Sequence, residues 1–138
     1  MGYWTALTLA VVKNAMPTDL AALHAAWIDT NPGKAARLEE LVLEAVRMFR
    51  ASVAANPVNV LDAETDTVPT TGYWHALNWV IFNVAMEMGA PLSPEAYQAV
   101  TRADVYLRLV ANGGIPVGYP ETGSPSYEAP EEDRRVLI

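Results

Sequence analysis

The clearest helical pattern in the chain lies between residues 32 and 55. Apolar side chains there recur at intervals of three and four residues, which places them on one face of a helix. That face consists of Leu38, Leu41, Val42, Ala45, Val46, Phe49 and Val53. Charged residues lie mostly off it, so we predict an amphipathic helix with one side against the core. Asn31 and Pro32 suit its start, and Asn56-Pro57 ends it.

Two further helices follow from their end signals. Thr18 is placed to cap a helix whose shared face consists of Leu20, Leu23, Ala26 and Trp27. Ser93 and Pro94 open a later helix that ends at the Asn112-Gly113-Gly114 turn. The apolar face of that helix consists of Ala96, Val100, Ala103, Leu107 and Val110. A shorter helix over residues 7–14 leads the chain.

The longest apolar run, GYWHALNWVIFNVAMEMG, covers residues 72–89 and raises the question of a membrane span. A span needs about 20 mostly apolar residues. His75, Asn78, Asn83 and Glu87 would each cost free energy at bilayer depth, and the flanks carry no basic cluster. We therefore predict a helix of a soluble protein.

This run is apolar around nearly the whole helix, with one stripe formed by Trp74, Leu77, Ile81, Val84, Ala85 and Met88. Thr70 or Thr71 can cap it, and Gly89 can end it in a left-handed conformation. A helix of this kind is buried on most sides. We expect it at the centre of the domain, with Trp79 in the core, or also in contact with another subunit.

The remaining segments predict loops and a tail. Residues 56–72 are rich in Pro, Thr and acidic residues, which indicates an exposed loop with one short strand around residues 58–61. Residues 114–138 carry prolines at 116, 120, 125 and 130, which oppose helix and sheet pairing. The fold class is thus all-α: a bundle of four main helices plus a short leading helix over residues 1–113, followed by an extended Pro/Gly-rich acidic tail over residues 114–138, mobile in the free protein.

Composition excludes several classes of function. The chain has 138 residues, a net charge of -7 and no cysteine. Acidic surfaces repel phosphates, which argues against specific nucleic-acid binding. Without cysteine there is no disulfide, thiol catalysis or cysteine-ligated zinc. The first residues lack the pattern of a secretory signal, so we expect an intracellular protein.

Candidate chemistry is sparse. We interpret His24, in the stretch LHAAW, as a packing or capping residue, and His75 as a hydrogen-bonded residue at a helix start. An interface or pH-sensitive contact is the alternative for His75. Asp62, Glu64 and Asp66 alternate as calcium ligands can, but the loop lacks the glycine and final glutamate of an EF-hand, which favours a solvated loop. We predict no catalytic residue, cofactor or metal.

Several large aromatic and aliphatic side chains are candidates for binding a partner protein. Trp74, His75 and Trp79 lie on the apolar helix, where aromatic rings are common anchors of an interface. The tail adds further apolar anchors beside an acidic cluster, which suits a segment that orders against a neighbour. These tail candidates are Tyr119, Tyr127, Val136, Leu137 and Ile138.

Three stretches resemble the small head–tail adaptor proteins (head-completion or connector proteins) of tailed bacteriophages. They are YWTALTLAVVKNAMPTDLAAL near the start, RLEELVLEAVRMFRASVAANP in the middle, and YQAVTRADVYLRLVANGGIPVG toward the end. Together they span residues 3–118. The likeness is one of helix order, loop placement and side-chain character.

The resemblance implies a virion structural protein that is made in the host cytoplasm. Such proteins bind beneath the portal protein as a ring, typically of twelve copies, and offer a surface to the next tail or stopper protein. DNA passes through their channel without specific binding, and no membrane is involved. Two other classes stay open: a regulatory or inhibitory binding module of prophage origin, and a small helical enzyme or enzyme subunit with a perturbed histidine or acid in a pocket.

Overall fold

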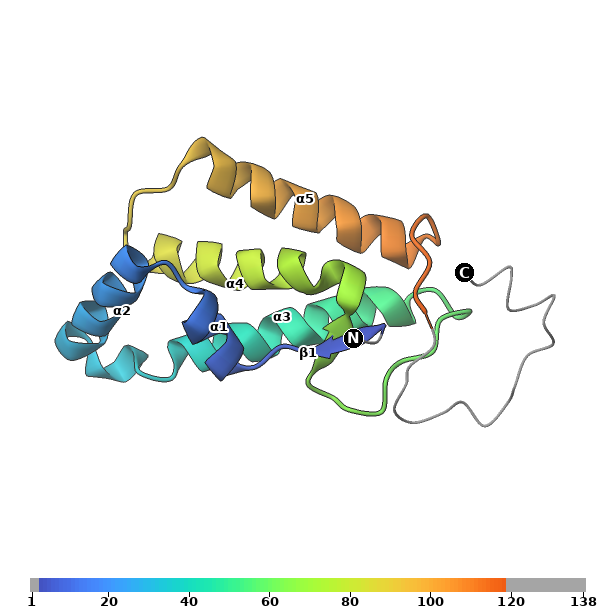
Figure 1. Cartoon of the computed structure of the whole chain (residues 1–138), viewed down its shortest axis with the longest axis horizontal. Coiled ribbons are helices and arrows are strands. Elements are labelled where there is room, and N and C mark those ends of the chain that lie inside the picture. The colour runs from blue at the N-terminus through green and yellow to red at the C-terminus, as the bar shows by residue number, and fades with distance from the viewer. Residues whose placement is uncertain (1–2, 119–138) are drawn as a thin grey trace.

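The computed structural model describes residues 3–118 of the chain, and the statements below refer to these residues. They form a mostly helical domain with one small sheet. In chain order the elements are β1 (Trp4–Ala6), α1 (Leu9–Ala15), α2 (Thr18–Thr30), the 3-10 turn η1 (Pro32–Lys34), α3 (Arg37–Ala54), β2 (Thr67–Pro69), the 3-10 turn η2 (Thr70–Gly72), α4 (Tyr73–Glu87) and α5 (Pro94–Ala111). Figure 1 shows α4 between α3 and α5, with α1 and α2 to one side.

The predicted apolar face of α3 packs into the hydrophobic core. All seven of its apolar residues are buried, so the prediction from periodicity is confirmed. The central place of α4 is also confirmed. Its buried residues share Leu77, Val84 and Ala85 with the predicted stripe and add Ala76 and Val80. Ile81 and Met88 of the stripe are partly buried against the core. Trp74 is 66% exposed and Trp79 is partly buried. Since α3 and α5 pack on α4 from two sides, its small and branched residues occupy the contacts, and the large rings lie at the margins.

Several helix starts differ from the predicted caps. Helix α2 begins at Thr18 itself, with Pro17 as its cap residue and no side-chain cap. Helix α3 begins at Arg37 rather than at Pro32, because the Asn31 amide donates back to the Trp27 carbonyl and the chain then makes a 3-10 turn. In contrast, the Ser93 cap of α5 is confirmed: its hydroxyl accepts from the Ala96 N–H at 3.2 Å.

The two threonines expected to cap α4 instead tie it to other elements. The hydroxyl of Thr70 lies 2.7 Å from that of Thr5, and the hydroxyl of Thr71 lies 2.8 Å from that of Tyr106. The predicted left-handed conformation of Gly89 is confirmed, with a φ of 72°. Gly113, in the turn predicted to end α5, also has a positive φ, of 84°.

The strand predicted around residues 58–61 is wrong. The strand of this region is β2, which pairs antiparallel with β1 in the register Trp4↔Pro69, Thr5↔Val68 and Ala6↔Thr67. The partner strand lies at the start of the chain, so the pairing joins residues more than 60 positions apart. Sequence periodicity does not reveal which distant segments will pair.

Arg50 holds the loop between α3 and β2. Its guanidinium donates to the backbone carbonyls of Asp62, Glu64 and Thr67, the latter two at 3.0 Å, and to the Thr67 hydroxyl. The same group lies over the Trp4 ring, 5.3 Å from its centroid, in a cation–π contact. One side chain of α3 thus joins the loop, β2 and β1.

This arrangement corrects the expectation of a solvated acidic loop. Asp62 is 4% exposed and its carboxylate accepts from the Thr67 hydroxyl at 2.9 Å, so it is a structural residue. Glu64 and Asp66 stay exposed. Within residues 3–118, no three His, Asp or Glu side chains are placed to hold a metal ion.

The first residues of the expected tail pack on the domain. Val117 is buried, Ile115 is partly buried, and the Gly118 carbonyl accepts from the Trp4 indole N–H at 3.3 Å. Residues 114–118 therefore follow β1 rather than extending away from it. The rest of the predicted tail, residues 119–138, lies outside the described residues.

We expect Arg50→Lys to lower the free energy of unfolding by about 2–3 kcal/mol, because an ammonium cannot span carbonyls on two sides as the guanidinium does. Arg47→Lys, on an exposed position of the same helix, is the matched control and should change it by less than about 0.5 kcal/mol. Urea unfolding measures both. Equal stability of the two variants would contradict the role given to Arg50.

Gly72→Ala should cost about 1–3 kcal/mol through overpacking. An added Cβ would lie 2.5 Å from the Tyr106 ring, which is itself stacked on Phe49 and on His75. Gly33→Ala is the control, since a Cβ there has no heavy atom within 4 Å. Thermal unfolding should separate the two variants; a Gly72 variant as stable as the Gly33 variant would show that the ring can yield.

Candidate functional site

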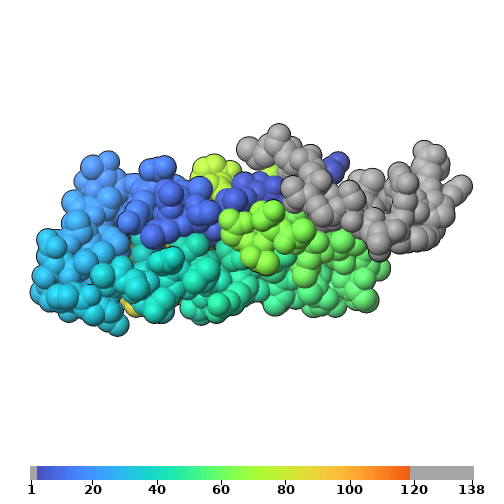
Figure 2. Space-filling view, turned by 90° about the horizontal axis from the view of Figure 1, so that it is seen from below, coloured from blue at the N-terminus to red at the C-terminus, as the bar shows by residue number. Residues whose placement is uncertain are grey.

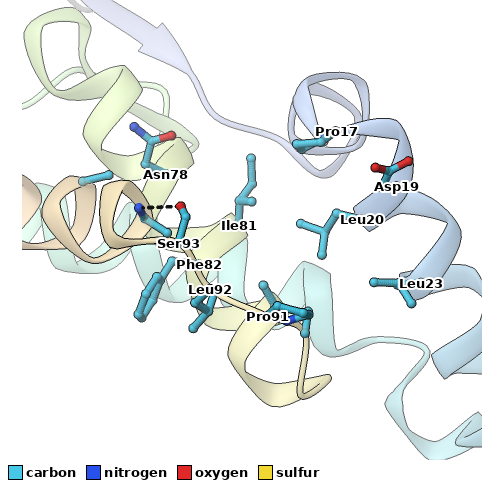
Figure 3. A pocket seen from close by; sticks show the side chains of 14 residues that line it. Pro17, Asp19, Leu20, Leu23, Asn78, Ile81, Phe82, Pro91, Leu92 and Ser93 are labelled. Carbon is cyan, nitrogen blue, oxygen red and sulfur yellow. Dashed lines mark hydrogen bonds between the residues drawn. The ribbon is translucent and has the colours of Figure 1, made fainter.

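One feature of residues 3–118 that could receive a partner is an apolar groove of about 490 Å³. Helix α2 forms one wall, and α4 with the start of α5 forms the other. Figure 3 shows Leu20 of α2 facing Ile81 of α4, with Pro91 and Leu92 of the connection between α4 and α5 at one end. Its lining residues are Pro17, Asp19, Leu20, Leu23, Asn78, Ile81, Phe82, Ala85, Ala90, Pro91, Leu92, Ser93, Ala96 and Ala99.

The groove exists because α2 uses its apolar face only in part. Leu20 and Trp27 pack against the core, while Leu23 remains 49% exposed. On the other wall, the Phe82 ring makes an edge-to-face contact with Tyr97 of α5, with centroids 5.3 Å apart. This contact fixes Phe82 as part of a preformed wall.

A second hollow of about 340 Å³ continues the groove along α2. It shares Leu23, Ala90 and Pro91 with the groove and reaches Trp27 and Met88. The two together make a contiguous apolar surface, which is typical of an interaction site.

The polar groups of the groove suit binding rather than bond chemistry. Its polar side chains are Asp19, Asn78 and Ser93, and the Ser93 hydroxyl already caps α5. Asp19 is the one charged side chain among the lining residues. The groove can therefore bury apolar side chains and meet one positive charge at its rim.

The structure separates the predicted partner-binding residues from this groove. Trp74 is exposed in the first turn of α4 and meets the Tyr73 ring edge to face at 5.5 Å. The His75 ring stacks on the Tyr106 ring, with centroids 5.1 Å apart, and this ring contact rather than a helix-start hydrogen bond is what the structure shows for it. Trp79 packs against the core. None of the three lines the groove.

The other five candidates, Tyr119, Tyr127, Val136, Leu137 and Ile138, lie outside the described residues. Leu23, Ile81 and Phe82 line the groove but were not predicted from the sequence to bind a partner; Leu23 and Ile81 were assigned to apolar helix faces. The available signal was the apolarity of α4 around its whole circumference, which already pointed to a surface beyond the core.

The surroundings of both histidines favour the neutral form of the imidazole ring. His24 is 8% exposed beside Trp27, and its Nε2 has no hydrogen-bond partner among the described residues. Burial, and secondarily the charge of Lys13, lower its pKa. Burial and the charge of Arg102 likewise lower the pKa of His75.

An ion pair joins α3 to α4 at the end of α4. Arg37 Nε lies 2.9 Å and 3.0 Å from the two carboxylate oxygens of Glu87, and Nη2 adds a 2.8 Å contact. The hydrogen bonds from Arg37 lower the pKa of the Glu87 carboxyl. Glu87 is therefore accounted for by structure and is not a candidate acid or base.

Comparisons of the chain with protein-family models, with curated proteins and with solved structures find no match. No helix among residues 3–118 has the length and apolarity needed to cross a bilayer. The groove and the exposed ring of Trp74 are features of residues 3–118 that could contact a partner.

Stability should fall as the pH is lowered through the histidine range. A histidine in the unfolded chain takes up a proton near pH 6.5. The folded pKa values of His24 and His75 are lower, so between the two values the unfolded state binds more protons and is favoured. Urea unfolding at about pH 7.5 and about pH 5.5 measures this loss.

Two variants assign the loss to its source. His24→Leu should weaken the dependence of the free energy of unfolding on pH, because it removes the more buried of the two imidazoles. His75→Leu should remove a further part of this dependence. At lower pH the Arg37–Glu87 pair adds its own loss as the carboxylate is protonated. Identical pH profiles for wild type and both histidine variants would contradict this assignment.

Proposed function

We propose that the protein is a head–tail adaptor subunit of a tailed bacteriophage. In this role it binds in a ring beneath the portal protein and joins the DNA-filled capsid to the tail, after synthesis in the host cytoplasm. The resemblance of three sequence stretches supports the proposal. Those stretches contain β1 with α1 and the start of α2, then α3, then most of α5, which together make up much of the helical frame.

The observation that carries the proposal is the preformed apolar groove between α2, α4 and α5. A subunit of a protein assembly buries surface against neighbouring subunits, and the burial of apolar surface drives this association. The lining residues offer shape and apolarity with a single charge, which suits recognition of a protein segment more than turnover of a small substrate.

Trp74 gives a second surface for assembly. Its ring is 66% exposed in the first turn of α4, apart from the residues that line the groove. Tryptophan is enriched among the residues that dominate binding energy at interfaces. A ring subunit needs more than one surface, since it contacts neighbouring copies, the portal and the next tail component.

The charge of the chain also fits this role. A net charge of -7 opposes tight binding of phosphates, so DNA could slide through a channel formed by such subunits. The same charge opposes self-association of free subunits at low salt, which favours assembly on the portal over assembly in solution.

The direct test is co-expression with the portal protein encoded in the same genome. We expect a complex in which several copies of this chain join one portal ring, seen by native mass spectrometry, while the protein alone sediments as a monomer. Trp74→Ala should weaken the complex by about tenfold or more, as loss of an interface anchor does.

The control variant is Val58→Ala, which removes an exposed apolar side chain in the loop after α3 and should leave the complex intact. Both variants should unfold at nearly the wild-type temperature, because both side chains are exposed in the free protein. Absence of any complex with the portal, or a stable ring formed without it, would overturn the proposal.

A further inference from the structure

We infer that the groove receives helix α5 of a second copy of this chain. The inference deepens the proposed function and rests on it in one respect, namely that copies of the chain are brought side by side. Two surfaces would then meet: the groove of one copy and the outer face of α5 on the next. Both surfaces lie within the residues that the structure describes.

The rim of the groove is acidic. Helices α2 and α4 contain no lysine or arginine, and the first such residue of α5 is Arg102, beyond the part that lines the groove. Asp19 lines the groove in the first turn of α2. Glu95 is exposed in the first turn of α5, between Ser93 and Ala96, which both line the groove. An occupant with positive charge beside its apolar side chains is therefore favoured.

The outer face of α5 has the complementary character. Val105 and Leu109 form its apolar part and are 39% and 37% exposed. Successive residues of a helix are turned by about 100°, so Arg102 and Arg108 lie about 60° to either side of Val105. Both arginines are exposed, and Asp104 lies about 100° from Val105, off this face. The face thus presents two aliphatic side chains flanked by two guanidinium groups.

A helix suits the groove better than an extended segment. Most of the lining residues belong to helices, whose backbone groups are already hydrogen-bonded within the helix. An extended segment would leave its own N–H and C=O groups unpaired against such walls, whereas a helix pairs them internally. The groove and the second hollow follow α2, which is about 20 Å long, and α5 is about 27 Å long. Helix α5 can therefore lie along the whole groove.

A subunit cannot fill its groove with its own α5. Ala96 and Ala99 of that helix line the groove, and they lie about 180° and 120° around the helix from Val105. The outer face of α5 therefore points away from the groove of its own chain, and another copy has to supply it. Since the groove and the face are different surfaces, each copy can bind one neighbour with each. Head-to-tail contacts of this kind close into a ring when the rotation between copies allows it.

The contact should be weak between free copies. A net charge of -7 on each copy opposes their approach at low salt, and two aliphatic anchors bury a small surface compared with a stable interface. A partner that holds several copies side by side raises their local concentration and makes a weak contact persistent. The free protein would then stay monomeric, while the bound copies contact one another.

Disulfide trapping between two full-length variants tests the inference, and the chain has no native cysteine to interfere. Leu23→Cys places a thiol in the groove (the groove variant), and Val105→Cys places one on the outer face of α5 (the face variant). The two are mixed in equal amounts and oxidised mildly, and mass spectrometry identifies the mixed dimer. We expect it to form about tenfold faster than in the control, because docking brings the two thiols together.

The control mixes the face variant with Leu43→Cys. Leu43 and Leu23 are the same residue type with nearly equal exposure, 48% and 49%. Leu43 belongs to α3, which forms part of the surface seen in Figure 2, and it does not line the groove. Thermal unfolding checks that all three variants fold, and guanidinium should abolish the difference in rate between the two mixtures.

Charge reversal tests the ionic part of the contact. Arg102→Glu with Arg108→Glu in the face variant should slow formation of the mixed dimer severalfold. Asp19→Lys with Glu95→Lys in the groove variant should restore the rate when the two reversed proteins are mixed. These substitutions also change net charge, so each rate is compared with that of the control mixture carrying the same change in the face variant.

Equal rates for the groove and control mixtures would overturn the inference. Faster formation of a dimer of two groove variants or of two face variants would also overturn it, because the contact would then be symmetric. Failure of the reversed pair to recover would overturn the pairing of the acidic rim with the arginines. None of these measurements involves a portal protein. Trapping without a portal complex would leave the contact and remove the phage role, and a portal complex without trapping would do the reverse.

Discussion

The guanidinium of Arg50 connects the two halves of the chain. It binds two carbonyls of the loop before β2 and the carbonyl of Thr67 in β2, and it lies over the Trp4 ring, so β1, β2 and α3 meet at one side chain. Pairing of β1 with β2 then fixes where α1 leaves the sheet. Because α2 follows α1 after a two-residue connection, the same anchor determines where the outer wall of the groove begins.

A second cluster locks the three long helices against one another. Phe49 of α3, Tyr106 of α5 and His75 of α4 stack in succession, and Gly72 gives the tyrosine ring the space it needs. The Arg37–Glu87 pair joins α3 and α4 at the other end. The wall of the groove formed by α4 and α5 is therefore rigid, whereas α2 is held less firmly: His24 is its only buried residue.

This difference between the walls fits a surface made for binding. A rigid apolar wall preorganises the site and lowers the entropy cost of association, and a lightly packed opposite wall can adjust to what enters.

The sequence by itself determined the local elements. The face of α3, the Ser93 cap and the glycine stops at Gly89 and Gly113 follow from propensities and spacings within a few residues, and the structure agrees with each. The exposure of Trp74 on α4, the pairing of β1 with β2 and the groove itself were decided only by tertiary structure. Each depends on contacts between segments far apart in sequence, and the side chains involved, such as Arg50 and Leu23, carry no local pattern that distinguishes a contact from exposure to water.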